Sequence, residues 1–93
     1  MIDDFEWDED KAARNYAKHG VSFETATRAF EDPFAHEWID DREDYGEERY
    51  IILATVDGRV LCVAYTEHDG IIRIISARGA EPHERRRYHE DEA

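Results

Sequence analysis

The sequence contains very little cysteine and very little lysine. Its one cysteine, Cys62, lies inside an apolar run, so we expect no disulfide framework, no thiol-rich metal site and a buried, inert thiol. Lysine occurs only at Lys11 and Lys18, and 24 acidic residues outnumber the 12 basic ones, for a formal net charge of −12. An acidic surface repels phosphate backbones and favours basic partners. By itself, the charge balance argues against nucleic-acid binding.

Long apolar runs are absent as well. No stretch approaches the length that a membrane span needs, and the N-terminal residues show no signal-peptide pattern, so we expect a cytoplasmic protein. The chain of 93 residues suffices for one core, and we predict a single domain over residues 1–93. With 41% apolar and 12% aromatic residues, it can bury that core although 39% of its residues are charged.

The N-terminal third predicts a short strand and two helices. The alternation in residues 5–7 indicates a strand, after which Asp8 caps a helix that Gly20 ends. Helical spacing predicts one shared face of that helix, made of Ala12, Ala13, Tyr16 and Ala17. Ser22 is a second N-cap, and the half-buried helix after it ends at Asp32, because the residue before a proline resists helical geometry.

The remainder predicts four strands and a final helix. The strands are expected at residues 34–39, 49–56, 60–66 and 71–77. Asp57-Gly58 is a strong hairpin signal, and Pro82 suits the first turn of the last helix. Strands this apolar on both faces are covered on both faces, so helices should lie against them. The expected fold is α+β, an antiparallel β-meander with two N-terminal helices and a C-terminal helix, in the order β-α-α-β-β-β-β-α.

The two hairpins set the register of three strands. A two-residue turn at residues 57–58 places Arg49 opposite Thr66. A four-residue loop over residues 67–70 places Thr66 opposite Ile71. Alternation then puts two groups of side chains on opposite faces: Arg49, Thr66 and Arg73 on one, and Tyr50, Tyr65 and Ile72 on the other.

Arginine is concentrated near the C-terminal end. Residues 71–89 hold five arginines but only two acids. Strict alternation puts Arg78 on the opposite face from Arg73, so both reach one phosphate only if the strand ends or bulges before Arg78. Arg73 interrupts an isoleucine-rich strand, and its partner is either a carboxylate such as Glu84 or a phosphate, which a guanidinium matches bidentately. In isolation, residues 85–87 are typical of a solvated helix face. The residues alone leave these alternatives open.

A set of motifs runs along almost the whole chain in a specific order and spacing. It consists of Trp7, Lys18-His19-Gly20, Ser22-Phe23-Glu24, Asp32-Pro33, Glu48-Arg49, Arg73-Ile74-Ile75-Ser76-Ala77-Arg78 and Glu84-Arg85 to Tyr88. Through these motifs, residues 5–88 resemble the BrnT toxins of bacterial and archaeal type II toxin–antitoxin systems. Such toxins are commonly basic, and this chain departs from them in its acidity.

The resemblance implies a RelE-like fold and a metal-independent ribonuclease that works without a cofactor and halts growth by cutting RNA. It also implies a cognate BrnA antitoxin, a ribbon-helix-helix DNA-binding protein that covers the toxin and represses their shared operon. The expected partners are therefore RNA and the antitoxin, in a hetero-oligomer, with DNA reached only through the antitoxin and no membrane.

Metal-independent RNA cleavage uses the 2′-OH of the substrate as nucleophile, and it needs a base, an acid and cations. His19 is the proton-transfer candidate because histidine changes charge near neutral pH, although a histidine before a helix-stopping glycine is also an ordinary capping residue. The candidates for stabilising the transition state are Arg49, Arg73 and Arg78. Glu84 acts as base or orients an arginine, and Tyr88 donates to the phosphate or packs. The residues expected to bind RNA are Trp7, Lys18 and Arg85, of which Trp7 equally suits core packing.

Two other functions compete with the ribonuclease. The first is a catalytically silent module that docks an antitoxin or another basic partner through its acidic surface. The second is an unrelated small enzyme that uses His19 and Glu84 on a small molecule, for which the sequence shows no pocket signature. No metal site is expected, because the remaining histidines lack ligand spacing: His36, His68, His83 and His89.

Overall fold

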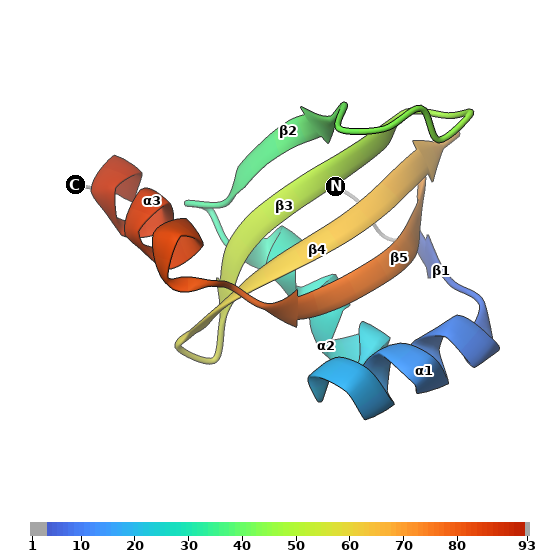
Figure 1. Ribbon diagram of the computed structural model, residues 1–93, viewed down its shortest axis with the longest axis horizontal. Coiled ribbons are helices and arrows are strands. Elements are labelled where there is room, and N and C mark those ends of the chain that lie inside the picture. Colours follow the sequence, from blue (N-terminus) through green and yellow to red (C-terminus); the bar gives the residue numbers. More distant parts are fainter. Residues whose placement is uncertain (1–3, 93) are drawn as a thin grey trace.

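The structure, a computed structural model, describes residues 4–92, which form three α-helices, a short 3-10 helix and one five-stranded sheet (Figure 1). In chain order the elements are β1 (Asp4–Glu6), α1 (Glu9–His19), α2 (Phe23–Thr27), the 3-10 helix η1 (Arg28–Glu31), β2 (His36–Asp40), β3 (Arg49–Val56), β4 (Arg59–His68), β5 (Ile71–Gly79) and α3 (Pro82–Glu92). The predicted α+β class is confirmed.

The strands lie in the order β1-β5-β4-β3-β2, and the sheet is mixed. Strands β2 to β5 form an antiparallel meander, but β1 pairs with β5 in parallel. The predicted antiparallel meander is confirmed for these four strands, and the parallel edge strand β1 was not foreseen. Phe5 packs on Phe30 and Trp7 on Phe23, and this burial holds β1 along the edge of β5. Alternation along a sequence identifies a strand, whereas such packing decides which strand it joins.

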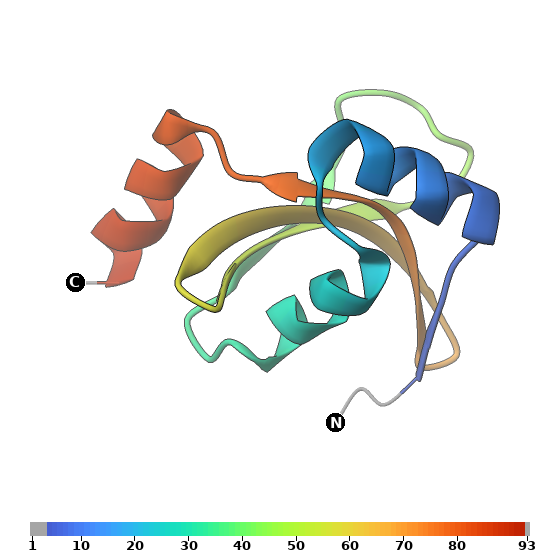
Figure 2. The ribbon, with the colours of Figure 1, turned by 90° about the horizontal axis from the view of Figure 1, so that it is seen from below.

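The two faces of the sheet are covered unequally. One face packs against α1, α2 and η1 in the larger core, around residues such as Phe23, Val63 and Ile74. The opposite face carries a smaller core, in which Tyr88 of α3 closes over Leu53. Figure 2 shows α3 apart from α1 and α2. Helices on both faces were predicted from the apolar strands, and this is confirmed.

Helix α1 has the predicted ends but a different buried face. Asp8 accepts a hydrogen bond from the Lys11 N–H at 2.9 Å, and Gly20 ends the helix in the left-handed conformation. The predicted alanine and tyrosine face is wrong, since Tyr16 is 60% exposed and Asn15 is buried. The prediction was based on the spacing of apolar residues. In the structure, the polar Asn15 takes the buried position of α1 because its amide has hydrogen-bond partners there.

The helical segment ends at Asp32, as predicted, because the Asp32 carboxylate accepts hydrogen bonds from two backbone N–H groups. These belong to Phe34, at 2.9 Å, and to Thr55 on β3, at 2.8 Å. The resulting turn points Phe34 into solvent, where 55% of it is exposed. Strand β2 therefore begins at His36. The predicted start at residue 34 is wrong by two residues.

Both hairpins close through two-residue turns with positive φ at each turn residue. Asp57-Gly58 is as predicted, with φ of 51° and 79°, and Asp69-Gly70 has φ of 53° and 82°. The four-residue loop predicted over residues 67–70 is wrong, and Thr66 faces Arg73 instead of Ile71. Because this shift is by two residues, Arg73 and the strand residues up to Ile74 keep their predicted faces.

Strand β5 contains a bulge at Ile75. Tyr65 pairs with Ile74 and Ala64 pairs with Ser76, so Ile75 is the extra residue between them. The bulge reverses the alternation for the rest of the strand. Arg78, which pairs with Cys62, consequently lies on the same face as Arg73, the face that also carries α3.

Candidate functional site

Two hollows adjoin at Arg78. The first, which we call the arginine cleft, has a volume of about 340 Å³ and is lined by Trp38, Ile39, Asp40, Asp41, Arg42, Ile51, Cys62, Ala64, Ser76, Arg78, His83, Glu84 and Arg87. The second, which we call the basic hollow, has a volume of about 450 Å³ and is lined by Lys18, His19, Arg59, Val60, Arg78, Gly79, Ala80, Glu81 and Arg85. Arg78 thus stands on the wall between them.

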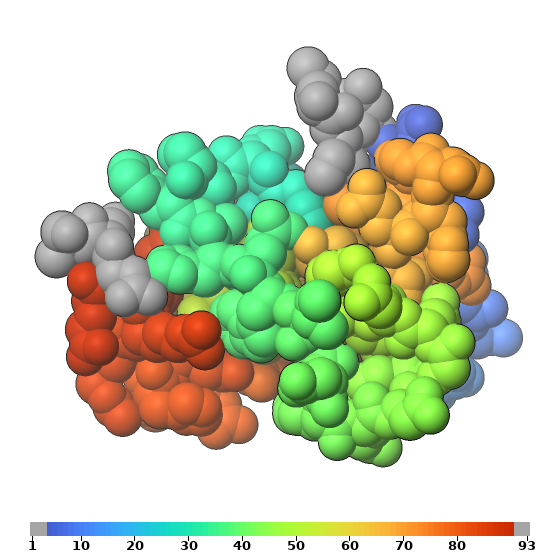
Figure 3. Space-filling model, turned by 90° about the horizontal axis from the view of Figure 1, so that it is seen from above, coloured from blue at the N-terminus to red at the C-terminus, as the bar shows by residue number. Residues whose placement is uncertain are grey.

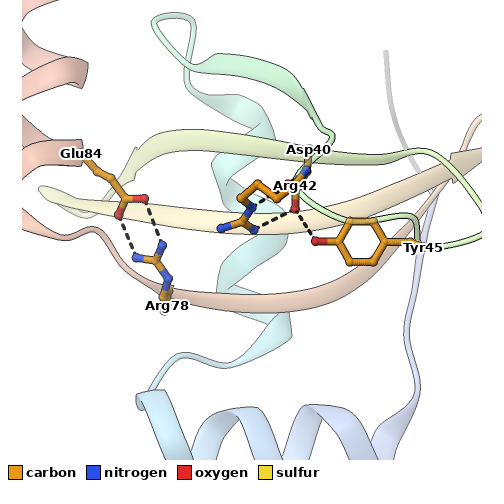
Figure 4. A network of polar contacts seen from close by, with 5 residues as sticks. All are labelled: Asp40, Arg42, Tyr45, Arg78 and Glu84. Atoms are coloured by element: carbon orange, nitrogen blue, oxygen red, sulfur yellow. Dashed lines mark hydrogen bonds and ion pairs between the residues drawn. The ribbon is translucent and has the colours of Figure 1, made fainter.

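The guanidinium of Arg78 is held bidentately by Glu84. Its Nη1 and Nη2 donate to the two carboxylate oxygens at 2.8 and 3.0 Å, and Nη1 also donates to the Gly79 carbonyl at 3.2 Å (Figure 4). Glu84 lies in the first turn of α3 and also accepts the Glu81 N–H at 2.8 Å, which caps that helix. The hydrogen bonds from Arg78 lower the pKa of Glu84 to about 2 against the opposing effect of burial.

The ion pair between Arg78 and Glu84 makes the free energy of unfolding depend on pH. The folded-state pKa of Glu84 is about 2 against an ordinary 4.5, so its contribution is complete above pH 4.5 and lost as the pH falls toward 2. We expect Glu84→Gln to lower the free energy of unfolding by about 1–2 kcal/mol at pH 7, allowing for solvent screening, and to converge with the wild type near pH 2. Urea unfolding across this range measures both effects, with Glu90→Gln as the control for removing one charge from α3. An unchanged gap between wild type and variant at pH 2 and pH 7 contradicts this role.

The far wall of the arginine cleft is a second arginine–carboxylate pair. Arg42 donates to the buried Asp40 carboxylate at 2.7 and 2.8 Å, which lowers the pKa of Asp40 to about 2, and Tyr45 donates to it at 3.2 Å (Figure 4). Beside it, the Arg87 guanidinium lies 4.3 Å from the ring centroid of Trp38. This contact joins α3 to β2, which lie side by side in Figure 3. The cleft therefore has an apolar floor and a rim of guanidinium and carboxylate groups.

The basic hollow gathers basic side chains from four segments. Lys18 and His19 come from the end of α1, Arg59 from the start of β4, Arg78 from the end of β5 and Arg85 from α3. In Figure 1 the end of β5 lies between α1 and α3. The one acid lining the hollow is Glu81. In a chain of net charge −12, this concentration of positive charge singles the hollow out as a place for an anion.

A buried amide fixes the strand segment that carries Arg78. The Asn15 side chain donates to the carbonyls of Val21 and Ala77 at 3.0 and 2.8 Å, and it accepts the Ala77 N–H at 3.1 Å. It therefore satisfies the backbone of β5 beyond the reach of β1, whose pairing covers residues 71–73. Asn15 also ties α1, and with it Lys18 and His19, to the same strand.

Arg49 and Arg73 lie farther along the same face. Arg73 donates to Glu6 at 3.0 Å, so its carboxylate partner is on β1 and is not Glu84, the partner considered from sequence. Arg49 lies 4.1 Å from the ring centroid of Tyr45. Its Nε, like the Thr66 hydroxyl, is buried without a hydrogen-bond partner among the described residues. Because Arg73 is separated from Arg78 by five residues of strand, about 15 Å, the two guanidinium groups occupy different parts of the face.

Trp7 and Tyr88 are placed by packing. Trp7 meets Phe23 edge-on, with ring centroids 6.0 Å apart, and its indole N–H donates to Glu9. Tyr88 is buried, and its hydroxyl donates to Asp32 at 2.5 Å. This bond fastens α3, which carries Glu84, to the turn before β2. The RNA-contacting roles suggested for both residues stay predictions.

The other sequence predictions about chemistry concern the thiol, metals and membranes. Cys62 is buried, and burial raises the pKa of its thiol to about 11. Among residues 4–92, no three His, Cys, Asp or Glu side chains are grouped as a metal ion would require. No helix in the described part of the chain is long and apolar enough to cross a bilayer.

Sequence reasoning missed four residues that shape the site. Asp40 and Arg42 lie between two predicted strands, in a stretch for which no functional residue was predicted, and Arg59 follows a turn without any distinguishing pattern. Asn15 had a usable signal, since a lone amide spaced three residues from Ala12 and four from His19 falls on one helical face. The other three meet their partners only through the fold.

This small α+β fold brings guanidinium groups from several elements together around the end of one strand. Guanidinium groups arranged in this way match the oxygens of phosphate groups. The family model described as "Ribonuclease toxin, BrnT, of type II toxin-antitoxin system" matches residues 7–84, and the chain belongs to this family. No curated protein matches it significantly. The resemblance inferred from the motifs is confirmed, and membership implies an RNA target and an antitoxin partner.

Proposed function

We propose that this protein is a metal-independent endoribonuclease, neutralised by a BrnA-type antitoxin, whose scissile phosphate binds at Arg78. The observation that carries the proposal is the position of Arg78 between the arginine cleft and the basic hollow, with its fork already aligned by Glu84. Glu84 and the Gly79 carbonyl take both hydrogens of Nη1 and one of Nη2. Among the described residues, this leaves the Nε–Nη2 edge of the guanidinium for two phosphate oxygens.

The proposed reaction forms a bond between the 2′-oxygen and phosphorus and breaks the bond to the 5′-oxygen. The 2′-OH proton passes to a base, and the departing 5′-oxygen receives a proton from an acid. His19 is the proposed proton-transfer group, since it lines the basic hollow beside Arg78. Arg78 stabilises the charge that develops on the phosphorane oxygens.

The remaining predicted residues take supporting roles in this proposal. Glu84 orients Arg78, because a carboxyl with a pKa of about 2 is a weak base at neutral pH. Lys18 and Arg85 hold the RNA in the basic hollow, while Arg49 and Arg73 contact phosphates farther along the same face. Tyr88 positions α3, and Trp7 supports the core beneath β1.

The proposed setting is that of a RelE-like toxin acting in the cytoplasm. Its antitoxin is a ribbon-helix-helix protein that covers the site and binds the operator DNA of both genes. The acidic remainder of the surface suits a basic segment of such a partner, since opposite charge speeds association at low salt. The protein itself then reaches DNA only through that partner.

The test uses purified protein, separated from any antitoxin, with an RNA oligonucleotide in EDTA. We expect cleavage that leaves a 2′,3′-cyclic phosphate, and no cleavage when the nucleotide before the cut carries a 2′-deoxyribose. His19→Asn is expected to remove one limb of the pH–rate profile, a change that a merely structural histidine does not cause. Cleavage that stops in EDTA refutes metal independence. Intact RNA with well-folded protein instead favours the silent module that docks a basic partner.

A further inference from the structure

The guanidinium of Arg59 lies directly against the backbone of Gly79. A Cβ built on Gly79 would meet the Arg59 Nη2 at 2.4 Å, a contact too close for any other residue type unless the arginine moved. Arg59 opens β4 and pairs with Val56, while Gly79 follows Arg78 at the end of β5. The absence of a side chain at position 79 thus lets this arginine lie flat across the floor of the basic hollow.

Arg59 is a cation without a carboxylate in this position. In the described part of the chain, the arginines held by ion pairs are Arg28, Arg42, Arg73 and Arg78, and Arg59 is not among them. The hollow also contains the cations Lys18 and Arg85, which outnumber the one acid among its described lining residues, Glu81. The Nη1 of Arg85 donates to the Ala80 carbonyl at 2.9 Å, which aims this side chain along the same wall. Cations brought together repel one another unless an anion lies between them.

We propose that Arg59, with Lys18 and Arg85, binds the RNA phosphate next to the scissile one. This inference rests on the proposed function, because it takes Arg78 as the place of cleavage. Arg78 lines both hollows, so a phosphate at Arg78 and a second one in the basic hollow belong to one continuous chain. A dinucleotide has one phosphate, at Arg78, and does not reach the position beside Arg59, Lys18 and Arg85, whereas a trinucleotide with the added nucleotide on the correct side fills both positions. The enzyme therefore requires a flanking phosphate for efficient cleavage.

The experiment compares kcat/KM for a dinucleoside monophosphate with kcat/KM for two trinucleotides, extended on the 5′ or the 3′ side. The wild type is expected to prefer one trinucleotide by about tenfold, the order of effect of a charge-assisted contact. Arg59→Ala should lose most of this preference, Lys18 and Arg85 retaining the remainder, and the kcat/KM of each variant for the dinucleotide serves as its own reference. Arg86→Ala is the matched control, since it removes an exposed arginine of α3 that does not line either hollow.

The variant Gly79→Ala tests the position of the Arg59 guanidinium without removing its charge. Its φ lies outside the left-handed region, so alanine fits the backbone, and the added methyl displaces the Arg59 guanidinium without altering the net charge. We expect it to lose most of the trinucleotide preference, and we expect Arg59→Ala combined with Gly79→Ala to lose no more than Arg59→Ala.

The outcomes separate this inference from the proposed function. Cleavage of all three substrates at similar rates, dependent on Arg78, overturns the second phosphate site and leaves the nuclease intact. If no RNA is cleaved, binding of the 2′-deoxy versions decides the matter: tighter binding of one trinucleotide that requires Arg59 supports the site, and equal or absent binding overturns it. A lower salt dependence of binding in Arg59→Ala, by about one phosphate contact, is the further expected result.

Discussion

Replacing Arg78 by lysine is expected to lower RNA cleavage by about 10²–10³-fold while leaving the protein folded. A lysine keeps a positive charge beside Glu84, so the partly buried carboxylate is not left unpaired. It lacks the planar fork that donates to two oxygens at once, and the phosphorane loses that bidentate contact. Growth arrest on expression and cleavage of an RNA oligonucleotide both measure the loss, and urea unfolding checks the stability.

The matched control for Arg78→Lys is Arg28→Lys. Arg28 also donates from both Nη atoms to a carboxylate, Asp57, at 2.8 Å each, but this pair is exposed and lines neither hollow. The control is expected to retain cleavage. If both lysine variants keep wild-type cleavage, the assignment of Arg78 to the phosphate is contradicted. If both lose cleavage to the same extent, the loss is a general effect of removing a guanidinium and the assignment is again contradicted.

Replacing Asn15 by alanine is expected to lower the free energy of unfolding by about 2–4 kcal/mol, a large share of the stability of a small domain. The variant loses three hydrogen bonds, and it leaves the N–H and C=O of the fully buried Ala77 without their partner. Because Ala77 precedes Arg78, we also expect the segment that holds the guanidinium to exchange its amide protons faster. Chemical unfolding and hydrogen exchange measure these two effects.

Two further variants make the Asn15 prediction specific. Tyr16→Ala removes a larger side chain from the adjacent position, and it is expected to change stability by no more than about 0.5 kcal/mol because Tyr16 is mostly exposed. Asn15→Asp keeps the acceptor for the Ala77 N–H but turns an ionised oxygen toward two carbonyls. It should recover part of the stability below about pH 4, where the protonated acid donates its one hydrogen to one of the two carbonyls. A loss that is the same at every pH argues against the hydrogen-bond explanation.

The local features of the fold were readable from short stretches of sequence. Asp8, Gly20 and Ser22 set helix ends through bonds to residues no more than four positions away. Asp57-Gly58 fixed one hairpin in the same way, while Asp69-Gly70 was missed because the preceding polar residues resembled a longer loop. Signals of this range need no knowledge of the rest of the chain.

The candidate site depended on contacts that no local pattern encodes. The bulge at Ile75 puts Arg73 and Arg78 on one face of the sheet, whereas strict alternation along the strand predicts opposite faces. Asn15 meets Ala77 across 62 positions of sequence, and the start of β4 meets the end of β5 through the register of a hairpin. Such contacts follow from how the helices pack on the sheet, and of the residues that sequence reasoning missed only Asn15 carried a local signal, its place on one helical face with Ala12 and His19.

The sequence by itself determined the family, the α+β class and the concentration of arginine in an acidic chain, because motifs, periodicity and composition are properties of residue order. Only the tertiary structure decided the partners of those arginines: Glu84 for Arg78, Glu6 for Arg73, and the backbone of Gly79 for Arg59. The physical reason is the short range of a hydrogen bond or ion pair. A guanidinium takes whichever anion or surface the packed core brings within about 3 Å of it, and that neighbour is set by the whole fold.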